Sequence, residues 1–502
     1  MVSFENLPAG DNLLVPLFYA EVSNRQASFF TNQPRTLIIG QKLAGAPGNT
    51  GVPILVTRTD EAKALFGEGS MLARMHETYR KGDTFGEVWC IALPDAGAGV
   101  AATGAIKFTA SPTEAGAYNR YFAGQRVQMA LASGDTPAAM ATALSAAINA
   151  KASLPVTAAV DGVDTAKVNI TARFKGDLGN DITIVANYLG ALGGEKDPAG
   201  LAETITAMSG GATNPDITLA VTAMGDEEYD HVVVPWTDTT TLDAMRAEMG
   251  DISGRWAWSR QIYGHVWSAR RGTVSAHATF LSARNDQHVT VHTFETDVPT
   301  PAWEVAAAWA ARSAVYLNNE PERPTQTGEL VGVLPAPAGK RFNLTERQTL
   351  LAQGGATAYV SGGVSRIERS VTTYKKNAWN QTDPSYRDVE TLFQIAFTLR
   401  FLRQRITQKF GRHALADDGT RFGPGKAIVT PNIIRAELIA AYGELERMGL
   451  VENAEAFKAH LIVKRNDTNP NRIDVLFPPD YVNQLRVFAV LNEFRLQYPA
   501  AA

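Results

Sequence analysis

Apolar segments of strand length alternate with helix-like segments along much of this chain, and this alternation restricts the folds that it can form. Segments typical of buried strands lie at residues 35–40, 88–93, 229–236, 261–267 and 288–293. Helix-like segments lie at residues 59–66, 71–80, 240–249, 273–284 and 301–316. Because strands that alternate with helices usually form parallel sheets with helices on both faces, the sequence predicts an α/β core with a largely parallel sheet.

The alternation stops between residues 96 and 215, where Ala, Gly and Thr become common. Short strands are predicted at residues 126–131 and 168–172, with one Ala-rich helix at residues 136–150. We therefore expect an α+β domain that is inserted into the α/β core. This stretch contains no motif that indicates a binding function.

A long amphipathic helix is predicted from Asp383 to about Arg412. Asp383 is a suitable N-cap residue, and Pro384 suits the first helical position, where a missing N–H costs nothing. Apolar residues recur at helical spacing, at Val389, Leu392, Ala396, Leu399, Leu402, Ile406 and Phe410. A strand at residues 367–374 precedes this helix. A second helix that starts at Pro431 follows it, and then a hairpin of residues 461–465 and 472–477.

Three motifs in this C-terminal region resemble the C-terminal domain of contractile tail sheath proteins. They are Arg366-x-x-Arg369-x-x-Thr372-x-Tyr374, Asp383-Pro384-x-Tyr386-Arg387-Asp388-Val389 and the Asn-Pro turn of the hairpin. Near the other end, residues 4–8, 15–16, 19–23 and 35–41 resemble the N-terminal segment of sheath proteins from Mu-like phages. Matches at both ends, in the same order, are more specific than one short motif.

The resemblance implies a structural subunit of a contractile tail, with a subtilisin-like α/β core and no cofactor. Such subunits would form stacked six-subunit rings, and thus a helical sleeve that surrounds the tail tube and contracts to drive the tube through the host envelope. The implied partners are further copies of this chain, the tail tube protein, and the baseplate and tail terminator proteins. The implied location is the virion tail, after assembly in the cytoplasm of the bacterial host.

The patterns and the resemblance together divide the chain into six parts. These are an N-terminal strand arm at residues 1–30, the first part of the α/β core at 31–95, the inserted α+β domain at 96–215, the second, subtilisin-like part of the core at 216–362, a C-terminal α+β sheath domain at 363–484 and a C-terminal strand arm at 485–502. The predicted fold class is therefore α/β, with one inserted domain and two extended arms.

Both chain ends have strand character without a sheet of their own. Pro16 makes the first segment suitable only for an edge strand, and an open sheet edge can accept a strand from another chain. We expect both arms to pair with receiver strands of other subunits, with hinges at residues 23–32 and 478–480. The candidate subunit-interaction residues are Leu14, Val15, Leu17, Tyr19, Val22, Leu485, Val487, Ala489, Leu491 and Phe494. The candidate receiver residues are Ile462, Val463, Lys464, Ile473, Val475 and Phe477.

A subtilisin-like core raises the question of a protease, since a serine protease needs a nucleophile, a base and an orienting carboxylate. No segment resembles a Gly-Thr-Ser-Met nucleophile loop, and the turns around Ser209 and Ser275 lack the flanking residues. No catalytic residue is assigned, because a fold alone does not imply a function. A degenerate subtilisin-like hydrolase is one alternative. The other is the sheath of a headless bacterial contractile injection device, which shares the fold and the mechanism.

Motifs for metal ions, phosphate and redox chemistry are weak. His288 and His292 have the spacing of a helical metal pair, but four residues of a strand span ~13 Å, which is too far for one ion. Residues 420–427 lack the first Gly and the Ser or Thr of a phosphate loop. The only cysteine, Cys90, lies in an apolar run and is expected to be a buried thiol. We therefore expect no metal site and no cofactor site.

Basic residues gather on the predicted long helix, at Arg400, Arg403, Arg405, Lys409 and Arg412. The net charge of −4 and the lack of interleaved stacking aromatics argue against direct nucleic-acid binding. Two explanations stay open, a solvated helix face or a contact with the tail tube through Arg405, Lys409 and Arg412. No apolar run reaches the roughly 18 residues that span a bilayer, so direct membrane insertion and an export signal are not expected.

Overall fold

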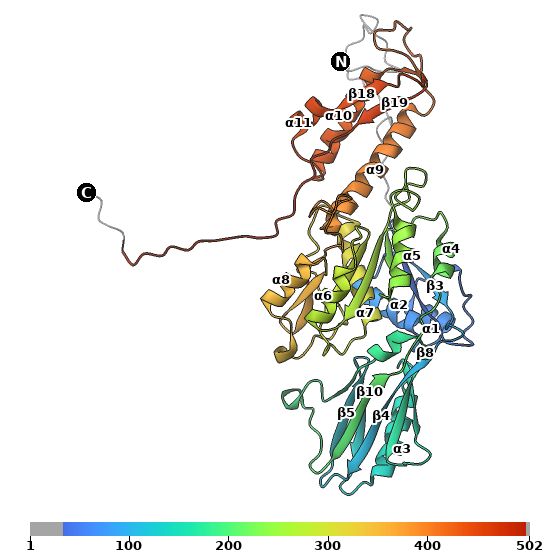
Figure 1. Cartoon of the computed structure of the whole chain (residues 1–502), viewed down its shortest axis with the longest axis vertical. Coiled ribbons are helices and arrows are strands. Elements are labelled where there is room, and N and C mark those ends of the chain that lie inside the picture. The colour runs from blue at the N-terminus through green and yellow to red at the C-terminus, as the bar shows by residue number, and fades with distance from the viewer. Residues whose placement is uncertain (1–33, 498–502) are drawn as a thin grey trace, which may run out of the picture.

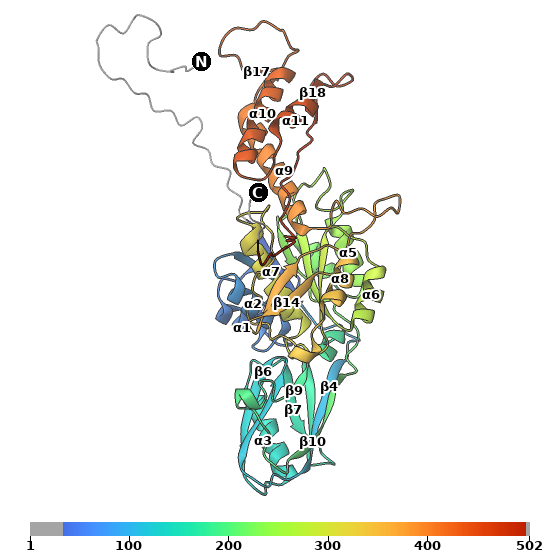
Figure 2. The same cartoon turned by 90° about the vertical axis from the view of Figure 1, so that its left-hand side faces the viewer.

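The computed structural model describes residues 34–497, which form a mixed α/β fold with three parts along one axis (Figure 1). A part built around a six-stranded sheet lies in the middle, a part with antiparallel strands lies at one end, and a largely helical part lies at the other. Figure 2, turned by 90°, shows the same order. The predicted N-terminal arm, with Leu14, Val15, Leu17, Tyr19 and Val22, lies outside the described residues.

The central sheet has the strand order β13-β12-β11-β1-β3-β2. Its strands are β1 (Arg35–Gln41), β2 (Pro53–Leu55), β3 (Glu87–Leu93), β11 (His231–Val233), β12 (His265–Arg271) and β13 (Val289–Phe294). Strand β2 pairs with β3 in the antiparallel direction, and the other five strands are parallel. All six residues of β13 are buried, so helices or loops cover both faces of the sheet there. The predicted, largely parallel sheet is confirmed.

Two of the predicted strands have different bounds. Strand β12 begins at His265, four residues later than predicted. Gln261 and Tyr263 have φ angles of 54° and 39°, which strand geometry does not allow, and so the chain turns before it enters the sheet. Strand β11 is limited to His231–Val233, the middle of the predicted segment 229–236.

Seven helices of the central part surround this sheet. They are α1 (Thr59–Phe66), α2 (Met71–Gly82), α4 (Thr218–Met224), α5 (Thr239–Met249), α6 (Val274–Ser282), α7 (Ala302–Leu317) and α8 (Leu344–Ala352). Helices α2 and α7 pack against each other, and Arg74 of α2 forms a buried ion pair with Glu304 of α7. Helices α1 and α2 match the predicted segments closely, because each is a short amphipathic run with clear ends.

The region predicted as an insertion contains two antiparallel sheets and one long helix. A four-stranded sheet has the order β10-β4-β8-β7, and a three-stranded sheet has the order β6-β5-β9. The elements are β4 (Ala101–Ala110), β5 (Gly116–Phe122), β6 (Gln125–Leu131), α3 (Pro137–Ala150), β7 (Val156–Val160), β8 (Lys167–Lys175), β9 (Ile184–Ala186) and β10 (Ala202–Ser209). The predicted helix and both predicted strands are confirmed, whereas the domain boundaries at 96 and 215 stay a prediction.

The C-terminal region contains two hairpins, three helices and a short parallel strand pair. The elements are β14 (Thr357–Ser361), β15 (Val364–Arg369), α9 (Val389–Phe410), β16 (Ala414–Leu415), β17 (Ile428–Val429), α10 (Pro431–Arg447), α11 (Ala454–His460), β18 (Ile462–Arg465) and β19 (Ile473–Leu476). Helix α10 starts at Pro431 with Thr430 as its N-cap, as predicted. The predicted hairpin at 461–477 is confirmed as β18 and β19.

The prediction that the long helix begins at Asp383 is wrong. Helix α9 begins at Val389, with Asp388 as its N-cap residue. Asp383 instead accepts hydrogen bonds from the backbone N–H and the hydroxyl of Ser385, each at 2.9 Å, and so it stabilises a turn. The segment before the helix is a turn, in which the Arg387 N–H donates to the Pro384 carbonyl at 3.0 Å, and a bridge between Val371 and Asp388 follows it directly before the helix begins.

Helix α9 runs from the central part into the C-terminal part (Figures 1 and 2), and it joins two hydrophobic cores. Its first turn contributes Val389 to the large core of the central part, and Phe393 packs against the same core. Further along, Phe401 belongs to a second core, formed with α10, α11 and the β18–β19 hairpin. One continuous helix therefore connects the central part with the C-terminal part.

Candidate assembly surfaces

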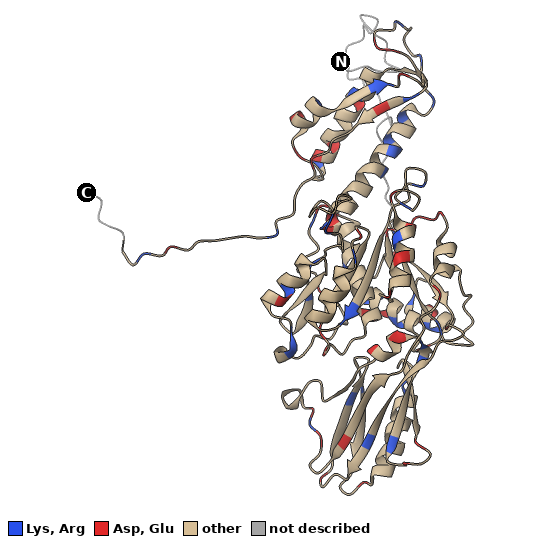
Figure 3. Cartoon of the chain, in the orientation of Figure 1, with Lys and Arg blue, Asp and Glu red and all other residues tan. Residues whose placement is uncertain are grey.

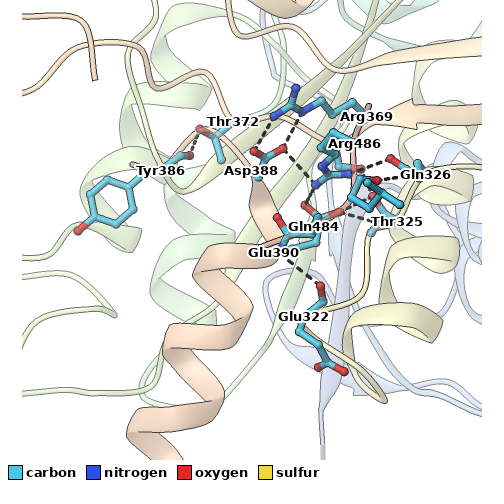
Figure 4. A network of polar contacts seen from close by, with 12 residues as sticks. Glu322, Thr325, Gln326, Arg369, Thr372, Tyr386, Asp388, Glu390, Gln484 and Arg486 are labelled. Atoms are coloured by element: carbon cyan, nitrogen blue, oxygen red, sulfur yellow. Dashed lines mark hydrogen bonds and ion pairs between the residues drawn. The ribbon is translucent and has the colours of Figure 1, made fainter. Parts of the chain in front are cut away.

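Asp388, the N-cap residue of α9, binds the guanidinium group of Arg369 on β15 (Figure 4). Two nitrogen atoms of Arg369 donate to the two carboxylate oxygens, each at 2.7 Å. A two-point contact of this kind is stronger and more directional than a single hydrogen bond. The hydrogen bonds to Asp388 raise the pKa of Arg369. The pair fixes the β14–β15 hairpin to the start of α9.

Other residues of the sequence motifs lie in the same connection. The hydroxyl of Thr372 donates to the carbonyl oxygen of Tyr386 at 2.7 Å. The hydroxyl of Tyr374 donates to Asp383 at 2.7 Å, and this bond is the main reason why the pKa of Asp383 is lowered. The rings of Tyr374 and Tyr386 meet edge to face, with centroids 5.3 Å apart. The motif residues therefore hold together the two chain segments that lead from β15 to the start of α9.

Glu390, in the first turn of α9, is fully buried. Its carboxylate accepts hydrogen bonds from the backbone N–H of Thr325 at 2.8 Å and from the Thr325 hydroxyl at 3.0 Å. A nitrogen of Arg486 donates to the other carboxylate oxygen at 2.8 Å. Arg486 also reaches Asp388 at 3.1 Å (Figure 4). The root of the C-terminal arm is thus bound to the start of α9.

Sequence reasoning did not assign a role to Glu390 or to Arg486. The two residues are 96 positions apart, and each lies in a segment with a plausible local role, a helix start or a strand-like arm. No helical or strand periodicity connects positions so distant.

The C-terminal segment after Arg486 extends away from the body of the subunit (Figure 1). Within the described part of the chain, residues 482–497 belong to no helix and no strand. The predicted interaction residues Leu485, Val487, Ala489, Leu491 and Phe494 are all exposed there. Apolar residues are exposed at odd and at even positions of this segment; Val487 is 78% exposed and Phe488 is 82% exposed. So much apolar surface on an extended segment is typical of an interaction site.

The β18–β19 hairpin carries the predicted receiver residues. Among the described residues it forms a sheet of two strands only, so one edge of each strand has no strand partner. Val463, Ile473 and Phe477 pack against the second core, whereas Lys464 and Val475 are exposed. Ile462 pairs with Leu476 across the hairpin, and these side chains are 53% and 57% exposed. The hairpin thus presents two open edges and an apolar outer pair.

Basic and acidic residues both lie along α9 and α10 (Figure 3). Two basic side chains of α9, Arg405 and Lys409, have acidic partners on α10, whereas Arg400 and Arg403 pair with acidic residues of the central part. Arg405 forms ion pairs with Glu437 at 2.5 Å and with Glu444, and Lys409 also pairs with Glu437. These contacts hold α9 and α10 together and reduce the positive charge available to a partner. Arg412, beyond the end of the helix, is exposed. The predicted contact of these residues with a tail tube stays a prediction.

Comparison with known proteins identifies the family. The family described as "Phage tail sheath protein central domain" matches residues 210–373, and "Phage tail sheath C-terminal domain" matches residues 381–495. The Mu-like prophage FluMu tail sheath protein of Haemophilus influenzae is 40% identical to this chain over 498 residues, which cover 99% of this chain and 100% of that protein. The chain belongs to the phage tail sheath protein family.

Solved sheath structures resemble this sheath protein at low sequence identity. The sheath tail protein of Desulfitobacterium hafniense is 10% identical with a TM-score of 0.47, covering 93% of this chain and 100% of that one. The sheath tail protein of Listeria innocua is 11% identical with a TM-score of 0.47, covering 90% and 93%. The contracted helical sheath of the anti-feeding prophage is 10% identical with a TM-score of 0.46, covering 97% and 99%. The family assignment rests on the sequence matches.

The two histidines at 288 and 292 of this sheath protein have separate partners. His288 contacts Asp251 at 2.8 Å, whereas His292 contacts the carbonyl oxygen of Ala356 at 3.1 Å. Within residues 34–497, no group of three or more His, Cys, Asp or Glu side chains is placed to hold a metal ion. Cys90 is buried, and burial raises the pKa of its thiol. None of the helices in this range is long and apolar enough to cross a membrane.

Proposed function

We propose that this sheath protein is the structural subunit of a contractile tail, which polymerises helically around a tail tube and contracts to drive the tube through the host envelope. Family membership supports this role. The observation that carries it furthest is that one chain has both an exposed apolar arm at residues 487–497 and a two-stranded hairpin with open edges. The arm has no sheet to join, and the hairpin edges have no strand partner.

The arm and the hairpin fit the chemistry of strand addition. An extended segment offers a row of backbone N–H and C=O groups, and an open sheet edge can pair with them. A two-stranded hairpin is only marginally stable, so added strands would also stabilise the receiver. In this proposal the C-terminal arm of one copy, and the N-terminal arm of another, pair with the β18–β19 hairpin of a third.

Contraction follows from two alternative packings of the same subunits. If the packings differ modestly in free energy per subunit, the difference summed over a long sleeve becomes a large driving force. Shared strands keep neighbouring subunits connected while the rigid parts move. Catalysis and a cofactor are not needed in this mechanism. The α/β core, which we assign to the subtilisin-like type, would act as a rigid body and not as a protease.

The proposed partners are other copies of the chain in stacked six-subunit rings, the tube protein, the baseplate and the terminator. The proposed site is the virion tail, assembled in the host cytoplasm. A sheath of a headless injection device would use the same fold and mechanism. A degenerate subtilisin-like hydrolase would instead react with a serine-directed probe.

Deletion of residues 487–502 tests the proposal. We expect the shortened chain to stay folded and monomeric, because the removed side chains that the structure describes are exposed. Negative-stain microscopy should show rings or tubes for the full chain and neither for the deletion variant. A deletion limited to residues 498–502 is the control. Normal tubes from the variant that lacks 487–502 would contradict the proposed exchange of the C-terminal arm.

A further inference from the structure

The chain before the arm is held by the C-terminal part up to residue 482. Tyr481 forms an antiparallel bridge with Val451, and the Val482 N–H donates to the Leu450 carbonyl at 3.1 Å. The side chain of Gln394, on α9, donates to the Val482 carbonyl at 3.0 Å. The predicted hinge at residues 478–480 is therefore followed by a segment that is bound to the loop between α10 and α11 and to α9.

Residues 484 and 485 are held by the central part. The side chain of Gln484 donates to the Glu322 carbonyl at 3.3 Å. The side chain of Gln326 donates to the Leu485 carbonyl at 3.2 Å. Glu322 and Gln326 belong to the loop that follows α7, far from α10 in the sequence. The chain thus crosses from the C-terminal part onto the central part.

Arg486 completes this attachment. Its guanidinium group contacts Glu390 at 2.8 Å, Asp388 at 3.1 Å and Gln326 at 3.4 Å (Figure 4). Glu390 is fully buried, and it also accepts hydrogen bonds from the neutral Thr325. If Arg486 left this place, the Glu390 carboxylate would stay buried without its cation. The cost of that unpaired charge opposes release of the arm root.

Exposure is continuous from the next residue on, although Leu485, just before Arg486, is already 68% exposed. The side chain of Arg486 is 12% exposed, whereas Val487 is 78% exposed and Phe488 is 82% exposed. We propose that Arg486 is a positioning residue that clasps the arm root to the subunit body, so that the exchanged span starts at Val487 and leaves in a fixed direction. This inference rests on the proposed exchange of arms and refines it.

The clasp limits how far the arm reaches. The described arm residues 487–497, fully extended, span about 37 Å. With a hinge at residue 480 the reach of residues 481–497 would be about 58 Å. A clasped arm therefore selects a receiver hairpin close to Arg486, whereas a free arm would reach several neighbours. Arg486 restricts which copy receives the strand.

Distances between paired spin labels in the dilute, unassembled subunit test the clasp. Cys90 is buried, so labels attach to cysteines introduced at exposed positions. The pair Thr345→Cys and Asn483→Cys reports on the clasped side, and the pair Thr345→Cys and Ala489→Cys reports on the free side. We expect a narrow distance distribution for the first pair and a broad one for the second.

Arg486→Met removes the guanidinium group and its charge and keeps an unbranched, apolar stem. We expect it to broaden the 345/483 distribution at least twofold and to raise the concentration needed for tube formation by about tenfold. Arg486→Lys should recover part of both effects. The control is Arg495→Met, the same substitution further along the arm, which should leave the 345/483 width unchanged. If Arg486→Met does not fold, the double variant Arg486→Met with Glu390→Gln removes both charges and should show the same broadening.

An unchanged 345/483 width in both the single and the double variant would overturn the clasp, as would equal broadening by Arg495→Met. These readouts do not depend on assembly. Failure of the full chain to form tubes would overturn the proposed function while the distance distributions still decide the clasp.

Discussion

Arg400 of α9 and Asp230, the residue before β11, form a buried ion pair between the long helix and the central sheet. Each side chain is 7% exposed. The guanidinium of Arg400 also lies over the Tyr263 ring, 5.4 Å from its centroid, and Asp230 accepts a hydrogen bond from the Arg35 N–H at 3.1 Å. Because a buried charge needs a partner, this pair ties the C-terminal part to the core.

Arg400→Met should lower the free energy of unfolding by about 3 kcal/mol, because it leaves the Asp230 carboxylate buried without its cation. The matched control is Arg403→Met on the same helix, where the side chain is 48% exposed and pairs with Glu228 at 3.2 Å. Loss of such an exposed pair should cost less than about 1 kcal/mol. Denaturant unfolding followed by tryptophan fluorescence measures both. Equal losses in the two variants would contradict the role of the buried pair.

Buried histidines should make the subunit less stable in acid. Burial lowers the pKa of His292 to about 3, whereas an unfolded histidine titrates near about 6.5. Between these values the unfolded chain binds a proton that the folded chain does not, so stability falls as pH drops below about 6.5, by about 1.4 kcal/mol per pH unit for each such residue. His76 and His277, with pKa values lowered to about 4, act in the same direction.

His292→Phe should therefore reduce the slope of unfolding free energy against pH between about pH 4 and 6. The centroids of the His292 and Trp309 rings are 4.1 Å apart, and a phenyl ring can make the same contact. The substitution does remove the hydrogen bond between His292 and the Ala356 carbonyl. The lost hydrogen bond lowers the unfolding free energy equally at every pH. The quantity to compare is therefore the slope of unfolding free energy against pH. The same substitution at the exposed His413 is the control. Identical slopes in the wild type and His292→Phe would contradict the prediction.

Local sequence patterns predicted the elements whose ends are set by nearby residues. Helix α1 coincides with the predicted segment 59–66, and α10 starts at Pro431 behind its Thr430 cap. The start of α9 was missed although Asp383 and Pro384 form a good start signal. The backbone N–H of Thr372 donates to the Arg387 carbonyl at 2.8 Å, and this non-local contact holds the segment before Asp388 in a turn instead of a helix.

The candidate site was predicted in part for the same reason. An arm and a hairpin are visible as apolar runs, so Leu485, Val487, Ile462 and their neighbours could be named from the sequence as candidates; the structure shows these three exposed, and their role in assembly stays a prediction. The contacts of Arg405 with Glu437 and of Arg486 with Glu390 join segments 32 and 96 residues apart. Such pairs depend on the packing of α9 against α10 and against the arm root, which periodicity does not encode.

Ile462→Asp should impair assembly without unfolding the subunit. Ile462 is 53% exposed on the outer face of the β18–β19 hairpin, so a carboxylate there stays hydrated in the monomer but would be buried by an added strand. We expect unfolding free energy to change by less than about 1 kcal/mol and the assembly concentration to rise at least about tenfold. Ile433→Asp on α10, where Ile433 is 39% exposed, is the control. Equal assembly defects in both variants would contradict the receiver role of the hairpin.

Charge reversal at the end of α9 separates the two explanations of its basic residues. Arg405→Glu would place a third carboxylate beside Glu437 and Glu444, so a defect there could arise from lost stability alone. Arg412→Glu avoids this problem, because Arg412 is exposed beyond the end of the helix. If the basic residues contact the tube, Arg412→Glu should weaken co-assembly with purified tube, more strongly at low salt, since screening weakens exposed charges over about 10 Å at 0.1 M. Sedimentation of sheath with tube measures this, and unchanged co-assembly at low salt would favour a solvated helix face.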